Sequence, residues 1–590
     1  MEIKEKTLPV LAEQGINANT TGVLFSTKRK GEWVDTTVDE FKTKVRGLAL
    51  GLYDLGIRRG DKVALHSENS AEWLIADQAI LSLGAVCVPI YTTQPGEQIK
   101  YILQDSEARI YMVSGDELYE SSKEFVSGAK NVEHHIKFFG DIPDGYKSMD
   151  DVVESGKALD EKDPELLEKC RNEVDPHDLA TLMYTSGTTG IPKGVMLTHH
   201  NIGSNIQSIP AFIPFDVEAN RHHKVLSFLP LSHAFERVVT YNWLYLGYQI
   251  CYIETTEELV QDIQVIKPIF FATVPRLLEK LHGGFKGKAN ELSGLKKKLF
   301  KWALRKAENY DLQNPDHGIG YKIADKAVYS KLREALGGNL HTVISGGAAL
   351  SGEMMSFING IGVVCSQGYG LTETSPVLTI VDTDNLKPGT VGWAIQDVEL
   401  KIANDGEILA KGPNIMKGYY KMPDKTAEVF NEDGWFMTGD IGKLDDKGFL
   451  YITDRKKALF KLSTGKYVAP QHVEGKISNS MYLEQGVVVG NGKKFCSALI
   501  IPDYKNLKNK LNIGGDPSPE ELAQNEKVLS LIQHEIDKVN RDLPKWETIK
   551  KYKILTTPFT IETGELTPKM SVKRAVVFEK YADLIDDMYS

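Results

Sequence analysis

Cysteine is scarce in this sequence, and long hydrophobic runs are missing from it. The five cysteines form no CxxC or Cys/His spacing, so they indicate neither a metal site nor a disulfide framework: Cys87, Cys170, Cys251, Cys365 and Cys496. No run approaches the roughly 18 apolar residues of a membrane-spanning helix. Residues 1–14 lack the apolar core of a signal peptide. We therefore expect a reducing, cytoplasmic location.

The sequence also has no excess of positive charge. The 80 acidic residues outnumber the 70 lysines and arginines, which gives a formal net charge of −10 and argues against broad nucleic-acid binding. The apolar share of 42% and the charged share of 25% are typical of a globular protein. At 590 residues, the chain exceeds the roughly 250–300 residues at which single cores stop growing, so we expect two or more domains.

Residues 184–194 combine hydroxyls, glycines and a lysine between two apolar runs, 179–183 and 195–197. Such a segment can wrap an anion, because glycines let backbone N–H groups turn inward while hydroxyls and lysine add donors and charge. The alternative is a polar hairpin turn. A Walker A loop is excluded, because Lys193 stands in a Pro-Lys-Gly sequence and a second strand follows it. We interpret the segment as a phosphate loop between two strands.

Helical and strand-like segments alternate through residues 34–113 and again after the phosphate loop. This alternation predicts an α/β fold with mostly parallel, helix-covered sheets. Residues 114–175 have an irregular pattern and are expected to form surface elements. Ligands of open α/β sheets bind at the carboxyl ends of strands. Four polar turns that follow predicted strands should therefore meet at one crevice: 232–233, 273–276, 345–349 and 367–370.

A basic amphipathic helix is predicted at residues 295–305, inside a helical stretch that spans 282–338. Leu295, Leu299 and Trp302 share one face of it, between several lysines. Such a helix can lie on an anionic membrane as a peripheral contact, at the inner face of a cell membrane. The alternative is an ordinary surface helix with a solvated lysine face.

Glycine- and proline-punctuated strands at 388–450 predict a small β subdomain. The last 130 or so residues have a separate pattern of strands and helices, with a hairpin around Asn491-Gly492 and a polar helix over about 519–542. We expect an N-terminal domain over 1–456 and a small, mobile α+β C-terminal domain over 457–590.

Four motifs occur in the order and spacing of the adenylate-forming (AMP-binding) superfamily. They are the phosphate loop, 369–373, 434–440 and 454–457. Within that superfamily the chain resembles the long-chain fatty acyl-CoA synthetases, on segments 229–237, 267–280 and 566–574. The resemblance runs from about residue 20 to about residue 580.

The resemblance implies an ATP- and Mg²⁺-dependent ligase. It would activate a long-chain fatty acid to acyl-AMP plus pyrophosphate, and then transfer the acyl group to coenzyme A. The partners are then a fatty acid, ATP and CoA, with no nucleic acid. Two alternatives stay open: an acyl adenylase that loads a carrier protein, and a non-catalytic acyl or nucleotide sensor. The oligomeric state is open as well, with a homodimer as one option.

The attack of a carboxylate on the α-phosphate of ATP requires charge neutralisation, because both groups are anions. Lys193 is assigned to the β/γ-phosphates, Glu373 to Mg²⁺, and Tyr369 to the adenine ring. Small residues at 347–349 let the backbone approach the other face of that ring. The predicted ATP/AMP contacts are Thr185, Ser186, Gly187, Thr188, Thr189, Gly190, Lys193, Gly347, Ala348, Ala349, Gln367, Gly368, Tyr369, Gly370, Thr372, Asp440, Ile452 and Arg455.

The remaining roles also follow from the resemblance. His233 is placed between the adenylate and the acyl or CoA channel, and Lys457 at the hinge of the small domain. The turn made by Ser463, Thr464, Gly465 and Lys466 should line a pantetheine tunnel. The adenylation lysine is assigned to Lys573, with Lys569 as the alternative. Strict counting from Pro568 puts Arg574 at that position, so the sequence departs from the family pattern here. The predicted catalytic set is Thr185, His233, Glu373 and Lys573.

Overall fold

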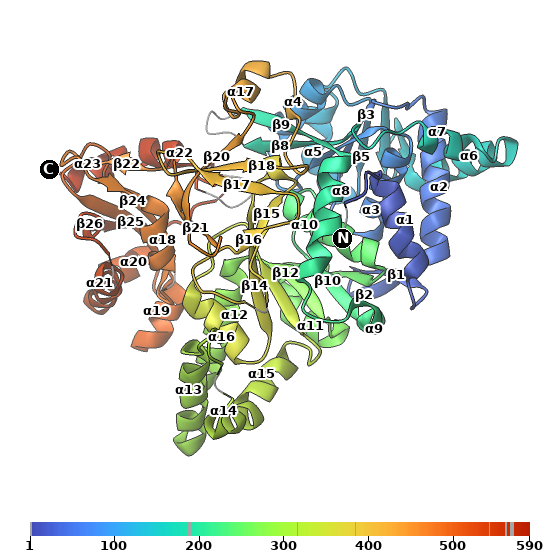
Figure 1. Ribbon diagram of the computed structural model, residues 1–590. Helices are drawn as coiled ribbons and strands as arrows, with labels where there is room; N and C mark the ends of the chain where they lie inside the picture. The colour runs from blue at the N-terminus through green and yellow to red at the C-terminus, as the bar shows by residue number, and fades with distance from the viewer. Residues whose placement is uncertain are drawn as a thin grey trace. The chain divides into compact units, whose positions relative to one another are not determined.

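The computed structural model describes residues 3–186, 191–315, 317–383, 385–456, 458–478, 480–541, 543–560, 563–566 and 572–590, with Ser186 described by its backbone alone (Figure 1). The chain divides into two compact units. The first comprises residues 1–400 and 410–436, and the second comprises residues 401–409 and 437–590.

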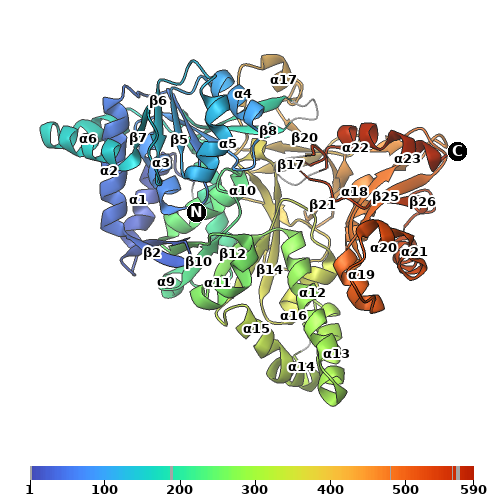
Figure 2. The same cartoon turned by 180° about the vertical axis from the view of Figure 1, so that it is seen from behind.

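An eight-stranded sheet in the first unit has the order β19-β9-β8-β4-β3-β5-β6-β7. Its strands are β3 (Lys62–His66), β4 (Val86–Ile90), β5 (Ile110–Val113), β6 (His134–Lys137), β7 (Tyr146–Ser148), β8 (Leu179–Ser186), β9 (Pro192–Thr198) and β19 (Gly418–Tyr419). The strands from β4 to β7 are parallel, whereas β8 and β9 form an antiparallel hairpin. Figures 1 and 2 together show helices on both faces of the sheet. The expected helix-covered parallel sheet is therefore confirmed.

The region 114–175 is more regular than its sequence pattern indicated. Strands β6 and β7 extend the sheet through parallel pairing. Their short length hides the alternation of polar and apolar residues on which strand prediction depends. These two strands were not predicted from the sequence.

A nine-stranded sheet, also in the first unit, has the order β16-β15-β14-β13-β12-β10-β11-β1-β2. Its strands are β1 (Val23–Arg29), β2 (Glu32–Thr37), β10 (Lys224–Ser227), β11 (Gln249–Tyr252), β12 (Phe270–Thr273), β13 (Thr342–Ser345), β14 (Val364–Gly370), β15 (Val377–Ile380) and β16 (Trp393–Ala394). Neighbours β10, β12, β13 and β14 are parallel. Their carboxyl ends therefore lie along one edge, as predicted for the four polar turns. Strand β10 ends at Ser227, earlier than expected.

Helices of the first unit begin where the sequence predicts caps. Thr37 accepts from the backbone N–H of Glu40 before α2, and Ser70 accepts from that of Trp73 before α3. The helices are α1 (Leu8–Ala18), α2 (Val38–Asp54), α3 (Ala71–Ser82), α4 (Gly96–Ser106), α5 (Asp116–Val126), α6 (Met149–Lys162), α7 (Leu166–Asn172), α8 (His199–Ser208), α9 (Val217–Asn220), α10 (Ala234–Leu246), α11 (Leu259–Ile266), α12 (Pro275–Glu291), α13 (Gly294–Glu308), α14 (Ile319–Ala324), α15 (Ser330–Ala335), α16 (Gly352–Gly360) and α17 (Pro423–Ala427).

The second unit carries most of a four-stranded sheet and two smaller ones. The strands are β17 (Glu399–Ile402), β18 (Glu407–Lys411), β20 (Phe436–Leu444), β21 (Leu450–Arg455), β22 (Phe460–Lys461), β23 (Tyr467–Val468), β24 (Leu483–Val489), β25 (Cys496–Pro502) and β26 (Ile549–Ile554). The predicted hairpin around Asn491-Gly492 is confirmed by the antiparallel pairing of β24 with β25. The helices are α18 (Pro470–Ser478), α19 (Tyr504–Leu511), α20 (Pro519–Gln524), α21 (Glu526–Arg541), α22 (Arg574–Lys580) and α23 (Ala582–Asp587).

The polar helix expected over 519–542 is two helices, α20 and α21. Asn525 stands between them, and its side-chain oxygen accepts hydrogen bonds from the backbone N–H groups of Lys527 and Val528 at 3.0 and 3.4 Å. This capping ends one helix and starts another, because an asparagine side chain competes with the helical hydrogen bonds. Within the described part of the chain, no helix combines the length and apolar character needed to cross a bilayer.

Candidate active site

The predicted phosphate loop joins β8 to β9, as the sequence indicated. Thr185 pairs with Lys193, and Ser186 with Pro192. Directly opposed residues in an antiparallel pair share one face, so the Thr185 hydroxyl and the Lys193 side chain lie on the same side of the hairpin. Gly187, Thr188, Thr189 and Gly190 lie outside the described residues.

The base of this hairpin is held by Tyr184. Its hydroxyl donates to Oδ2 of Asp105 at 2.6 Å, and burial, reinforced by that carboxylate, raises the pKa of Tyr184 above its usual value. A Cβ atom on Gly194 would lie 3.1 Å from the Tyr184 ring, tighter than most real contacts. Glycine at 194 therefore lets the two strands close over a buried aromatic ring.

Glu373 lies in a short 3-10 turn, Thr372–Thr374, that follows β14. The Tyr419 hydroxyl donates to Oε1 of Glu373 at 2.9 Å, and the Met416 N–H donates to the Glu373 carbonyl at 2.9 Å. The Lys193 ammonium nitrogen lies 4.9 Å from the centre of the Tyr419 ring. The structure thus brings two predicted site residues, Lys193 and Glu373, to one tyrosine.

Tyr419 was not predicted as a site residue from the sequence. Its position depends on the pairing of β19 with β9, in which Tyr419 faces Val195. No local pattern encodes that pairing, since the two strands are far apart in the chain. The Gly418-Tyr419 dipeptide is the local sequence signal at this position, and by itself it is typical of an ordinary turn.

The side chains present fit a magnesium ion bound together with nucleotide phosphates. Oε1 of Glu373 is engaged by Tyr419, which leaves Oε2 as a hard oxygen ligand. No group of three or more His, Cys, Asp or Glu side chains forms a metal cage within the residues that the structure describes. A single protein carboxylate is sufficient to bind Mg²⁺ when substrate phosphates supply other oxygen ligands.

The proposed adenine wall follows β13, next to the motif that ends β14. Ser345 pairs with Gln367, so residues 347–349 and 367–370 begin from neighbouring strands. Gly347 has φ +75°, and residues 347–349 are all exposed. A Cβ on Gly370 would lie 1.7 Å from the Pro376 carbonyl oxygen, so only glycine fits there. Small residues here leave the strand ends open to a planar ring.

His233 lies at the start of α10, where the two sheets come together. Its Nδ1 accepts from the Phe235 N–H at 3.1 Å, and its ring meets the edge of Tyr91, which follows β4, at 6.4 Å. A neutral imidazole that accepts at Nδ1 carries its proton on Nε2. A Cβ on Gly346 would lie 2.8 Å from the Phe235 ring, so this helix start packs directly on the loop after β13.

Helix α10 is held in the first unit by a buried ion pair. A guanidinium nitrogen of Arg237 lies 2.5 Å from Oδ1 of Asp77 on α3, and another donates to the Thr181 hydroxyl on β8 at 2.8 Å. Burial opposes the charge on Arg237, but the Asp77 carboxylate outweighs it and raises the pKa of Arg237. The pair links the helix that carries His233 to the strand that leads into the phosphate loop.

The predicted ribose contacts lie together in the second unit. Asp440 on β20 pairs with Arg455 on β21, and Nε of Arg455 lies 2.9 Å from Oδ1 of Asp440. The Arg455 side chain is exposed while Asp440 is buried, so the pair presents the guanidinium outward. Ile452 is half-buried opposite Gly442. Lys457, the expected hinge, lies outside the described residues.

The predicted CoA residues form an exposed turn between β22 and β23. The Leu462 N–H donates to the Lys466 carbonyl at 2.9 Å, and Gly465 has φ +87°. Ser463, Thr464, Gly465 and Lys466 are all exposed. The Lys466 ammonium lies 5.1 Å from the centre of the Trp546 ring. The turn therefore offers an exposed backbone, a cation and a nearby aromatic surface.

Lys573 immediately precedes α22, and its N–H donates to the Glu565 carbonyl at 2.7 Å. Its half-buried side chain makes no hydrogen bond or ion pair with the residues that the structure describes. Arg574 is engaged instead, in an ion pair with Glu474 and a hydrogen bond to the Val488 carbonyl at 3.3 Å. Arg574 is thus part of the scaffold, and its assigned neighbour Lys573 makes no such contact with the residues that the structure describes. Lys569 lies outside the described residues.

Family models match nearly the whole chain. The model described as AMP-binding enzyme covers residues 17–420, and the model described as AMP-binding enzyme C-terminal domain covers residues 458–590. This chain belongs to the AMP-binding enzyme family. The resemblance inferred from four motifs is confirmed.

Relatives of this AMP-binding enzyme match along all or most of their length. The chain is 34% identical over 609 residues to long-chain-fatty-acid–CoA ligase FadD15 of Mycobacterium tuberculosis, covering 100% of both chains. It is 30% identical over 611 residues to long-chain-fatty-acid–CoA ligase 1 of Homo sapiens, covering 98% of this chain and 86% of the other.

Solved structures share the fold of this AMP-binding enzyme. The adenylation domain of a carboxylate reductase from Mycobacterium chelonae has a TM-score of 0.77 at 23% identity, with 99% of this chain and 91% of the other covered. The A-PCP didomain of a carboxylic acid reductase from Segniliparus rugosus, in complex with AMP, has a TM-score of 0.75 at 21% identity, with 99% and 82% covered. The fold-class prediction is therefore confirmed.

Proposed function

We propose that this AMP-binding enzyme is a long-chain fatty acid:CoA ligase that forms AMP. It converts a fatty acid and ATP to acyl-AMP and pyrophosphate, and then acyl-AMP and CoA to acyl-CoA and AMP. The observation that carries the proposal is full-length similarity to proteins named as long-chain-fatty-acid–CoA ligases. The arrangement of Lys193, Glu373 and Tyr419 is consistent with it, because it offers charge neutralisation for ATP.

In the first half-reaction, an oxygen of the fatty acid carboxylate attacks the α-phosphorus of ATP, and the bond to pyrophosphate breaks. The phosphate loop between β8 and β9 binds the departing pyrophosphate, with the Thr185 hydroxyl and the Lys193 ammonium on one face. Mg²⁺ held by Glu373 would neutralise phosphate charge. Lys573 donates to the carboxylate and α-phosphate oxygens, where negative charge must be relieved for attack.

In the second half-reaction, the CoA sulfur attacks the acyl carbonyl carbon, and AMP leaves with the electron pair. Lys573 is not needed in this step, and the turn at 463–466 is assigned to the pantetheine arm. His233, whose Nδ1 accepts from the Phe235 N–H, is assigned to the acyl carbonyl or the thiol in this step. Asp440 and Arg455 bind the ribose through both steps.

A ligase and a carrier-loading adenylase differ in the thiol that receives the acyl group. We expect AMP release from fatty acid and ATP to rise with free CoA and to be unaffected by a holo carrier protein. Coupled measurement of AMP with each thiol distinguishes the two. Stimulation by the carrier and none by CoA would contradict the ligase. No AMP with any carboxylate would favour the sensor.

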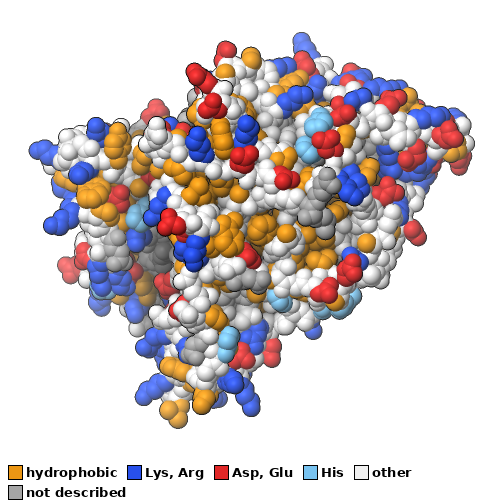
Figure 3. Space-filling model, viewed as in Figure 1, with side chains coloured by type: hydrophobic (Ala, Val, Ile, Leu, Met, Phe, Trp, Pro, Cys, Tyr) orange, Lys and Arg blue, Asp and Glu red, His pale blue; other side chains and the backbone are white. Residues whose placement is uncertain are grey.

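A peripheral membrane contact through α13 belongs to the same proposal. Leu295 is 84% exposed, and Leu299 and Trp302 are exposed on the same helix. Figure 3 shows hydrophobic side chains at the lower end, over α13 and α14, with lysine and arginine side chains beside them. The cations on this helix are Lys296, Lys297, Lys298, Lys301, Arg305 and Lys306. Exposed apolar residues within a basic helix suit an anionic lipid surface, which also holds fatty acids.

Vesicle binding tests this contact. We expect the protein to co-sediment with vesicles containing phosphatidylglycerol, and the double substitution Leu295→Ser with Trp302→Ala to weaken binding roughly tenfold. Val265→Ser is the matched control, because Val265 is a 65% exposed apolar residue on α11. No binding by the unaltered protein, or equal weakening by Val265→Ser, would contradict the proposal.

A further inference from the structure

Tyr419 lies on the same face of the sheet as the phosphate-loop lysine because of strand register. It pairs with Val195 in the antiparallel contact between β19 and β9, and Lys193 lies two residues before Val195. Residues two apart on a strand share a face, and such diagonal neighbours are within reach of long and aromatic side chains. The 4.9 Å between the Lys193 nitrogen and the Tyr419 ring centre is within the range of a cation–π contact.

The hydroxyl at the end of the same ring reaches Glu373. It donates to Oε1 at 2.9 Å, while Tyr419 is 7% exposed and Glu373 is half-buried. A neutral donor on one oxygen fixes the rotation of the carboxylate and directs the other oxygen.

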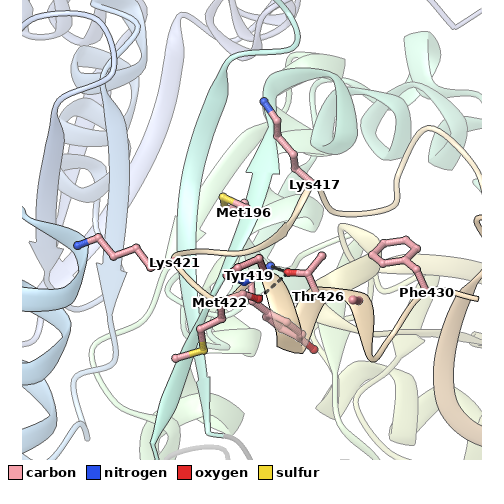
Figure 4. Close-up of a pocket in the computed structure, with 9 residues that line it drawn as sticks. Met196, Lys417, Tyr419, Lys421, Met422, Thr426 and Phe430 are labelled. Carbon is pink, nitrogen blue, oxygen red and sulfur yellow. Dashed lines mark hydrogen bonds between the residues drawn. The ribbon is translucent and has the colours of Figure 1, made fainter.

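The backbone of Tyr419 is secured independently of its hydroxyl. Its N–H donates to the Thr426 hydroxyl at 2.9 Å, and that hydroxyl donates to the Met422 carbonyl at 3.0 Å (Figure 4). Beside it, the Met416 N–H donates to the Glu373 carbonyl. A cavity of about 530 Å³ is lined by Tyr419 together with Met196, Lys417, Lys421, Met422, Pro423, Thr426, Ala427 and Phe430. Loss of the hydroxyl alone should therefore leave the fold intact.

We propose that Tyr419 is a positioning residue that sets the geometry of both the metal ligand Glu373 and the phosphate cation Lys193. The inference rests on the proposed function, since it takes Glu373 as a ligand of Mg²⁺ and Lys193 as a contact of ATP. One rigid ring orients the carboxylate through its edge and the ammonium through its face. The two charges that ATP meets are thereby placed relative to each other before the nucleotide binds, which lowers the cost of binding.

The test is Tyr419→Phe, which keeps the ring over Lys193 and removes only the hydroxyl that holds Glu373. We expect fatty acid-dependent pyrophosphate release to fall on the order of tenfold, as for other residues that orient metal ligands. The Mg²⁺ concentration at half-maximal rate should rise by a similar factor. A role in folding alone would lower the melting temperature without moving the Mg²⁺ dependence.

Tyr420→Phe is the matched control, because Tyr420 is the next residue and its hydroxyl donates to Glu107 at 3.3 Å instead. It should retain the rate and the Mg²⁺ dependence of the unaltered protein. An unchanged Mg²⁺ requirement in Tyr419→Phe, with or without a lower rate, would overturn the inference. Glu373→Gln tests the assignment of Glu373 to Mg²⁺ separately from the role of Tyr419. Full activity in that variant refutes the metal assignment, whereas loss of activity beside a normal Tyr419→Phe refutes only the role of Tyr419.

Discussion

At the scale of single residues, two neighbouring cations at the start of α22 have different tasks. Arg574 is committed to Glu474, a half-buried carboxylate whose pKa is raised by burial and lowered in part by the guanidinium. Lys573 has no such partner among the described side chains. Motif counting places Arg574 at the position of the family's lysine, and the assignment of that role to Lys573 stays a prediction. Sequence alone could not separate them, since the partner on α18 is distant in the chain.

The assignment of Lys573 predicts a selective loss. Lys573→Ala should lower acyl-AMP formation by at least on the order of 100-fold, because charge relief at the reacting oxygens disappears. Thioester formation from supplied acyl-AMP should be largely retained, which a paired assay with acyl-AMP and CoA measures. Lys569→Ala is the control and should keep both steps. The reverse pattern in the two variants would move the role to Lys569.

At the scale of elements, strand order determines which predicted residues meet. The turns after β10, β12, β13 and β14 were assigned to one edge because ligands of parallel sheets collect there, and the topology confirms it. Lys193 and Glu373 were also predicted, because each lies within a local motif. Tyr419 could not be predicted, because β19 reaches β9 only through the folded sheet. The break between α20 and α21 was missed as well, since Asn525 interrupts an otherwise continuous polar pattern.

The buried Arg237–Asp77 ion pair, which links α10 to α3, should contribute strongly to the stability of the first unit. Asp77→Asn should lower the free energy of unfolding of the first unit by roughly 3–5 kcal/mol, because it leaves a buried guanidinium without its charge partner. Urea unfolding followed by tryptophan fluorescence measures this. Glu40→Gln, which breaks an exposed pair with Lys44 on α2, should change stability by less than about 0.5 kcal/mol. Equal effects would show that burial of the pair is unimportant.

At the scale of the whole molecule, the predicted site residues divide between the two compact units. The first unit holds the phosphate loop, Glu373, His233 and the adenine wall, and the second holds Asp440, Arg455, the CoA turn and Lys573. Under the proposed function, each unit is expected to contribute groups to the two half-reactions. The domain boundary at Lys457 stays a prediction.

The central claim is that one enzyme couples ATP cleavage to AMP with thioester formation. Its most direct test measures AMP, pyrophosphate and acyl-CoA together, with CoA and fatty acids from short to very long chain. The account predicts equal amounts of the three products, highest with long chains and dependent on Mg²⁺. Formation of ADP, or of AMP without acyl-CoA at saturating CoA, would contradict it.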